Sequence, residues 1–271
     1  MIRAAVLGSP ISHSLSPTLH TRAYAELGID GRYEAIEVGP GELKKFIDDI
    51  AGGWTGFSLT MPLKEEAIPI ASEISDIARQ VASANTLVVT KSGWSATSTD
   101  VNGFKEALAS HIELDFERVV ILGSGATARA VAAACDTFAK EITVIHRSEK
   151  RVIAMQNSAP NTTLTFSTWD SPLLPTDLIV NTTPSGVADI FVDRIPDSFS
   201  GVFFEALYNP WPTKLLRHFR EKGYLGIDGL DFLIHQGIDQ IELMSGVKIN
   251  LEERKSLAPI LRSACLVKLE R

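Results

Sequence analysis

The sequence predicts an α/β protein built from two domains. Short apolar, β-branched runs alternate with segments of helical periodicity along the 271 residues, a pattern typical of α/β folds. A glycine-rich turn follows one of these runs near the middle of the chain, and six such runs lie between residues 119 and 227. A chain of this length can form two cores.

The glycine-rich turn at residues 123–128 (GSGATA) follows the apolar run 119–122 (VVIL) and leads into an Ala-rich segment, 126–138. This strand–turn–helix order fits G-x-G-x-x-A, the fingerprint of dinucleotide binding. Gly123 permits the tight turn, Gly125 lets a pyrophosphate approach the backbone, and Ala128 lets the helix lie close to the strand. The free N–H groups at the helix start favour phosphates. We therefore expect a Rossmann-type domain, for which six strands are the usual number.

The second strand of that unit, 142–145 (ITVI), ends in a basic turn that indicates which dinucleotide binds. NAD sites carry Asp or Glu there to accept from the ribose 2′-hydroxyl. This chain has His146, Arg147 and Ser148, with Arg151 behind them, and a guanidinium suits the 2′-phosphate of NADP. We therefore expect NADP(H) as the cofactor. The alternative is a solvated basic turn without a ligand.

The N-terminal region alternates strands and helices. Strands are predicted at 4–8, 33–38 and 56–60, and the Lys-Ser-Gly turn between 86–90 and 94–97 predicts a hairpin. Pro17 suits the first position of a helix that reaches about residue 27, with Ser16 as its N-cap. Further helices are predicted at 41–50, 65–71 and 74–83.

The rest of the chain supplies the second domain and then two long helices. A helix is expected from 101 to 111, followed by strands at 119–122, 142–145, 164–166, 178–181, 202–205 and 224–227. Helices at 231–244 and 251–269 close the chain, and we expect them to return to the N-terminal domain. The predicted domains are therefore 1–101 plus 236–271, and 102–235, with a ligand cleft between them.

Composition excludes several classes of protein. With 45% hydrophobic residues the chain is globular, and its net charge of −7 disfavours a general nucleic-acid binder. Cys135 and Cys265 lie in apolar segments without metal-like spacing, so two buried thiols and no metal site are expected. Neither a signal peptide nor a membrane span is predicted, so we expect a cytoplasmic protein.

Polar side chains gather in the loops of the N-terminal region, at Ser14, Ser16, Thr60, Lys64, Asn85 and Asp100. Ligands of open α/β sheets bind beyond the carboxyl ends of the strands, so these loops can converge on one pocket. Serine hydroxyls can donate to a carboxylate, Asn and Asp can distinguish ring hydroxyls, and lysine can donate to a carbonyl oxygen that gains negative charge. Ordinary structural alternatives are helix caps for Ser16 and Asp100, a solvated lysine, and a turn at Asn85.

Seven short motifs, in order, resemble those of the shikimate dehydrogenase family and extend over nearly the whole chain. They are residues 8–17 (GSPISHSLSP), 58–64 (SLTMPLK), 84–87 (ANTL), 98–100 (STD), 181–186 (NTTPSG), 208–216 (YNPWPTKLL), and Gly229-Leu230 with Gln236. Together, at fitting intervals, they are far more specific than any one of them. The resemblance implies an α/β substrate domain beside the Rossmann-type domain. It implies an NADP-dependent oxidoreductase acting on a CH–OH group, which reversibly reduces 3-dehydroshikimate to shikimate in aromatic amino acid biosynthesis.

The resemblance also implies roles for individual residues. Lys64 and Asp100 would form the catalytic pair, with Lys64 either donating the proton or serving as an electrostatic anchor. The implied substrate-binding residues are Ser14, Ser16, Thr60, Lys64, Asn85, Asp100, Tyr208 and Gln236. The implied cofactor-binding residues are Gly123, Ser124, Gly125, Ala126, Thr127, His146, Arg147, Ser148, Arg151, Thr182 and Gly229. The expected partner is a small molecule, shikimate or 3-dehydroshikimate, without nucleic acid or membrane, and the expected assembly is a monomer or homodimer.

The sequence departs from the family pattern at two positions and leaves alternatives open. Ser58 and Ser98 stand where the family usually has Asn, which shortens a hydrogen-bonding group near each proposed catalytic residue. One alternative is a quinate/shikimate dehydrogenase using NAD, which the basic turn disfavours. Another is a glutamyl-tRNA reductase, which needs a nucleophilic cysteine and a surface for tRNA. The third is a catalytically weak, NADP-binding relative, in which Lys64, Asn85 and Asp100 would have no joint purpose.

Overall fold

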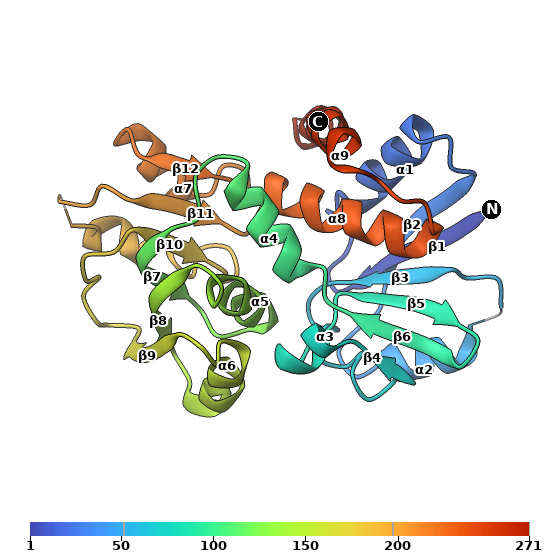
Figure 1. Cartoon of the computed structure of the whole chain (residues 1–271), viewed down its shortest axis with the longest axis horizontal. Helices are drawn as coiled ribbons and strands as arrows, with labels where there is room; N and C mark the ends of the chain where they lie inside the picture. The colour runs from blue at the N-terminus through green and yellow to red at the C-terminus, as the bar shows by residue number, and fades with distance from the viewer. Residues whose placement is uncertain (51, 197, 271) are drawn as a thin grey trace. The chain divides into compact units, whose positions relative to one another are not determined.

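The computed structural model describes residues 1–50, 52–196 and 198–270, and Figure 1 labels its helices and strands. The chain divides into two compact units, Met1–Gly103 with Leu233–Arg271, and Phe104–Phe232. Both boundaries fall inside helices, α4 (Asp100–Ala109) and α8 (Gly229–Ser245). The C-terminal helices therefore return to the N-terminal unit, which confirms that part of the predicted fold.

The first unit is organised around a mixed six-stranded sheet. Its strands lie in the order β2 (Gly31–Glu37), β1 (Ile2–Gly8), β3 (Gly56–Leu59), β5 (Thr86–Thr90), β6 (Gly93–Thr97) and β4 (Glu73–Ile74). β1 pairs in parallel with β2 and β3, whereas β5 runs antiparallel to β3 and β6. The carboxyl ends of β1, β3 and β6 and the start of β5 therefore meet at one edge of the sheet, where the predicted polar loops begin.

Helices α1 (Ser16–Glu26), α2 (Leu43–Asp49), α3 (Asp76–Gln80) and α9 (Leu251–Leu269) complete this unit with α8. α9 packs against α1, and it begins with a capping box in which Asn250 and Glu253 each bond the other's backbone N–H. The core is apolar, and Leu7, Phe57 and Leu87 are among its fully buried residues. The predicted hairpin of β5 and β6 is present.

Three local predictions in this unit were wrong. The helix at 65–71 is absent, because residues 61–70 form successive turns, and Pro69 inside this segment lacks the N–H that a helix needs. The segment 74–83 forms the end of β4 and only the short helix α3. Leu15, not Ser16, is the N-cap of α1, and Ser14 Oγ instead accepts from the Ser16 backbone N–H at 3.3 Å.

The second unit has the predicted Rossmann topology. Six parallel strands lie in the order β12 (Leu225–Ile227), β11 (Val202–Glu205), β10 (Leu178–Asn181), β7 (Phe116–Leu122), β8 (Ala139–His146) and β9 (Thr163–Thr168). Counted along this unit the order is 3-2-1-4-5-6 in reverse, and its strand order switches between β7 and β10. β10 and β11 are wholly buried, as their continuous apolar runs predict.

Helices cover the second sheet. α5 (Ala126–Cys135) packs on β7, β8 and α6 (Val152–Ser158), and α7 (Lys214–Glu221) packs on β11, β12 and the 3₁₀ segment η2 (Asp189–Arg194). A second 3₁₀ segment, η1 (Glu149–Arg151), precedes α6. Helices α6 and α7 were not predicted from the sequence. Cys135 and Cys265 are both buried free thiols, as expected. Within the described ranges, the helices are too short or too polar to cross a bilayer.

Candidate active site

Lys64 and Asp100 form a largely buried ion pair in the first unit. Lys64 lies in the turns after β3, and Asp100 is the first residue of α4. Lys64 Nζ donates to Asp100 Oδ2 at 2.6 Å, and the two side chains are 15% and 6% exposed. A charge-assisted hydrogen bond between largely buried groups is strong, and burying either charge without its partner would cost free energy. The solvated lysine and the simple helix cap, the ordinary alternatives for these residues, do not describe this geometry.

Asn85 joins this pair to two further side chains. Its Nδ2 donates to Asp100 Oδ1 at 2.7 Å, to Gln236 Oε1 at 3.1 Å and to Thr99 Oγ1 at 2.9 Å. Its Oδ1 accepts from the Thr99 backbone N–H at 2.8 Å, which fixes the orientation of the amide. Four residues that the sequence placed far apart are therefore brought together: Lys64, Asn85, Asp100 and Gln236.

The backbone explains why these side chains converge. The Ala84 N–H donates to the Lys64 carbonyl at 2.8 Å, and the Leu59 N–H donates to the Asn85 carbonyl at 2.7 Å. α4 and α8 approach so closely that a Cβ on Gly103 would lie 2.5 Å from Gln236 Cβ. Glycine at 103 is thus required for Gln236 to reach Asn85.

The predicted carboxylate-binding loop lies at the same sheet edge. Ser14 and Ser16 follow β1, and the Ser9 N–H donates to the Met61 carbonyl at 3.1 Å, which ties this loop to the one that begins at Thr60. Ser16 is buried, and its carbonyl lies 2.9 Å from His20 Nδ1. Burial lowers the pKa of His20 to about 4, so this ring is neutral near neutral pH.

The glycine turn of the second unit combines a positive φ angle with an open backbone position. Gly123 has φ +107°, and a Cβ there would lie 2.8 Å from Thr182 Oγ1. Gly125 is the N-cap of α5 without a side-chain cap, and among the described residues nothing lies within 4 Å of a Cβ built on it. The first N–H groups of α5, from Ala126 and Thr127, therefore start at a site that is open to a phosphate.

The basic turn follows β8 beside this glycine turn, since the Gly123 N–H donates to the Ile145 carbonyl at 2.9 Å. Arg147, Ser148 and Arg151 are exposed, and the Arg147 guanidinium lies 5.9 Å from the centroid of the Trp169 ring. His146 is buried, with Nδ1 2.6 Å from the Ser148 carbonyl. Its ring meets Phe166 edge-on, with the ring centroids 5.4 Å apart.

Glu205 is a buried carboxylate at the end of β11 that sequence analysis missed. It accepts from Asn181 Nδ2 at 3.0 and 3.1 Å, from Thr213 Oγ1 at 2.7 Å and from the Leu207 N–H at 3.2 Å. Burial raises its pKa to about 7 against the opposing effect of these bonds. The signal was a lone acid ending the buried run 202–205. Glu205 thus ties the loop that carries Thr182 to the loop that carries Tyr208, which is half-buried.

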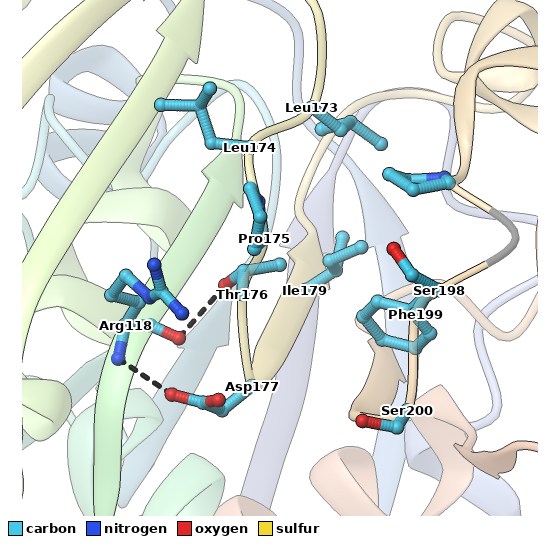
Figure 2. A pocket seen from close by; sticks show the side chains of 11 residues that line it. Arg118, Leu173, Leu174, Pro175, Thr176, Asp177, Ile179, Ser198, Phe199 and Ser200 are labelled. Carbon is cyan, nitrogen blue, oxygen red and sulfur yellow. Dashed lines mark hydrogen bonds between the residues drawn. The ribbon is translucent and has the colours of Figure 1, made fainter.

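Two further predicted residues, Ser124 and Gly229, lie in the second unit. Ser124 lies within the glycine turn, and Gly229 begins α8, where a Cβ would lie 2.5 Å from the Leu207 carbonyl carbon. A cavity of about 100 Å³ lies at the opposite, amino-terminal edge of the second sheet. Arg118 and Asp177 are among the residues that line it (Figure 2). It contains none of the predicted site residues. Across the described ranges, His, Cys, Asp and Glu side chains form no cluster of three suited to a metal ion.

Comparisons with known proteins agree with this geometry. Residues 6–87 match the model of the shikimate dehydrogenase substrate binding domain. A shikimate dehydrogenase (NADP(+)) from Microcystis aeruginosa is 36% identical over 261 residues, which cover 89% of this chain and 90% of that protein. The crystal structure of Mycobacterium tuberculosis shikimate dehydrogenase superposes with a TM-score of 0.85 at 34% identity, covering 96% of this chain and all of the other. A Thermus thermophilus shikimate 5-dehydrogenase in complex with NADP(H) and shikimate gives 0.80 at 29% identity, with coverages of 96% and 100%.

Proposed function

Because the chain belongs to the shikimate dehydrogenase family, we propose that it catalyses the reversible, NADPH-dependent reduction of 3-dehydroshikimate to shikimate. The observation that carries this proposal is the buried Lys64–Asp100 pair, held at 2.6 Å among Asn85 and Gln236. A lysine, an acid and two amides at one sheet edge suit a polyhydroxylated ring with a reducible carbonyl.

The substrate would be held by loop residues together with residues of α1, α4 and α8. Ser14, in the loop after β1, and Ser16, the first residue of α1, would donate to the substrate carboxylate, joined by Tyr208. Ring hydroxyls would bond Thr60, Asn85, Asp100 and Gln236. In the first unit Asn85 already bonds both Asp100 and Gln236. Such a set rejects analogues that lack a hydroxyl, because its buried polar groups would then be left unpaired.

Lys64 would act at the carbonyl that is reduced. Its Nζ carries three N–H donors, of which one bonds Asp100, and another can point at the substrate oxygen. In the direction of reduction this oxygen gains negative charge, which the ammonium stabilises or neutralises by transferring a proton. Asp100 would hold Lys64 in place and accept from a neighbouring ring hydroxyl.

NADP(H) fits the second unit. The open space over Gly125 and the start of α5, whose N-cap makes no side-chain bond, would receive the pyrophosphate on residues 123–127. The exposed guanidiniums of Arg147 and Arg151, with Ser148 and the adjoining His146, would hold the 2′-phosphate. Thr182 and Gly229 would border the nicotinamide. When bound, the cofactor supplies or accepts the hydride.

We also propose that the enzyme works in the cytoplasm as a monomer or homodimer, without nucleic acid or membrane. Its acidic net charge of −7 opposes binding to polyanions. Sedimentation equilibrium would give the number of chains in the assembly.

Replacement of Lys64 by Ala tests the catalytic assignment. We expect kcat for shikimate oxidation to fall by about 100-fold or more, the scale of positioned acid–base catalysis, with a smaller change in KM. The measurement is the initial rate at the nicotinamide absorbance band. A raised KM with kcat near that of the unmodified enzyme would show that Lys64 only binds substrate.

A further inference from the structure

A chain of buried hydrogen bonds ends at Asp100 and includes residues that no motif singled out. The Tyr33 hydroxyl donates to Ser58 Oγ (2.6 Å), which donates to Gln240 Oε1 (2.7 Å). Gln240 Nε2 donates to Thr86 Oγ1 (3.1 Å), which donates to Asn85 Oδ1 (2.8 Å). Asn85 Nδ2 then donates to Asp100 Oδ1 (2.7 Å). Thr86 is fully buried and Gln240 is 1% exposed.

The direction of this chain is set by groups whose roles cannot reverse. The Thr99 backbone N–H can only donate, so it fixes the Asn85 oxygen as its acceptor and turns Asn85 Nδ2 toward Asp100. Gln240 Nε2 can likewise only donate, so the Thr86 hydroxyl accepts from it and donates its own hydrogen bond to Asn85 Oδ1. Every donor therefore points toward the carboxylate, an arrangement in which neighbouring bonds strengthen one another.

Gln240 is placed for this task by helical spacing. It lies four residues after Gln236 on α8, so both side chains lie on the face turned toward Asn85. Gln240 Nε2 makes a second bond, at 3.1 Å, to the Asn85 carbonyl. Gln240 thus contacts both the backbone of Asn85 and the hydroxyl that orients its side chain.

We propose that Thr86 and Gln240 are positioning residues that hold Asn85 in the orientation needed to donate to Asp100 and Gln236. The proposal rests on the function proposed above, because the orientation of Asn85 matters for catalysis only if it positions the Lys64–Asp100 pair. It also gives a reason for Ser58, which stands where the family usually has Asn. The longer Gln240 side chain reaches the shorter serine, so the buried hydroxyl is paired.

The test compares Thr86→Val with Thr86→Ser. Valine keeps nearly the shape of threonine but removes the hydroxyl that donates to Asn85 and accepts from Gln240, whereas serine keeps it. We expect Thr86→Val to lower kcat for shikimate oxidation about tenfold, the consequence of one lost buried hydrogen bond, with a smaller change in KM. Thr86→Ser should stay within about threefold of the unmodified enzyme. Gln240→Met should behave like Thr86→Val.

A matched control and a second readout separate positioning from packing. Ser83→Ala removes a buried hydroxyl whose bond, to the Val81 carbonyl at 3.4 Å, lies outside the chain, so kcat should be unchanged. In NMR spectra without ligand, the side-chain amide resonances of Asn85 should move in Thr86→Val and stay in Thr86→Ser. This readout needs no turnover, so an inactive unmodified enzyme would refute the proposed function while the positioning role is still tested. A Thr86→Val enzyme with unchanged kcat, or with unmoved Asn85 resonances, would overturn the proposal.

Discussion

The buried Lys64–Asp100 pair predicts an energetic coupling that a double-mutant cycle can measure. Asp100→Asn would leave the Lys64 ammonium, 15% exposed, without its carboxylate at 2.6 Å. Lys64→Met would leave the Asp100 carboxylate, 6% exposed, without its cation. Loss of one partner of a buried pair costs about 3–5 kcal/mol, because the remaining charge stays desolvated.

The double variant should be more stable than the sum of the single changes predicts. With both charges removed, no unpaired ion remains, and the side-chain oxygen kept by Asp100→Asn can still accept from Asn85 Nδ2. We therefore expect a coupling free energy of about 2 kcal/mol, within the range for residues in contact. All three variants should be inactive, so stability and catalysis are separated in the same set of proteins.

Urea unfolding followed by tryptophan fluorescence measures these free energies. Trp54 and Trp94 report on the first unit, whereas Trp169 and Trp211 report on the second, so a transition confined to one unit can be recognised. If the effects of the two single changes on the free energy of unfolding add within about 0.5 kcal/mol, the reasoning is refuted that each buried charge is stabilised by the other.

Three further predictions concern single residues. Gly103→Ala should lower the free energy of unfolding by about 1–3 kcal/mol and raise the KM for shikimate, because the new Cβ would lie 2.5 Å from Gln236 Cβ; unchanged stability and KM would mean that α4 shifts freely. Arg147→Ala should lower kcat/KM for NADP about tenfold or more and hardly affect kcat/KM for NAD, and equal losses would remove the 2′-phosphate assignment. The raised pKa of Glu205, about 7 against 4.5 in the unfolded chain, means that the folded state binds the proton more tightly. Its contribution to stability is full below pH 4.5 and is lost as pH rises through 7. The free energy of unfolding at pH 5 should therefore exceed that at pH 8.5 by up to about 3 kcal/mol. Glu205→Gln should flatten this difference, and an unaltered slope would contradict the pKa.

The fold could be predicted where local signals and tertiary structure agree. The six runs between 119 and 227 are buried parallel strands, and the turn GSGATA lies between β7 and α5 as its pattern predicts. The helix at 65–71 was wrong because Pro69 outweighs the apolar spacing. Helix α7 was not predicted from the sequence, although Thr213 caps it.

The candidate site could be predicted only in part. The motifs named Lys64, Asn85, Asp100 and Gln236, and the structure joins them by hydrogen bonds, while their roles stay predictions. Gln240 and Glu205 were missed because buried polar pairing depends on which elements pack together. Neither a glutamine one turn beyond a motif nor a glutamate at the end of a strand indicates its partner in the sequence.

The most direct test of the account is the initial rate with shikimate or quinate, each paired with NADP or NAD. We expect turnover confined to shikimate with NADP, which would support the substrate residues and the basic turn after β8 together. Activity with quinate and NAD would contradict the interpretation of Arg147. Cofactor binding without turnover in any of the four combinations would contradict the proposed function itself.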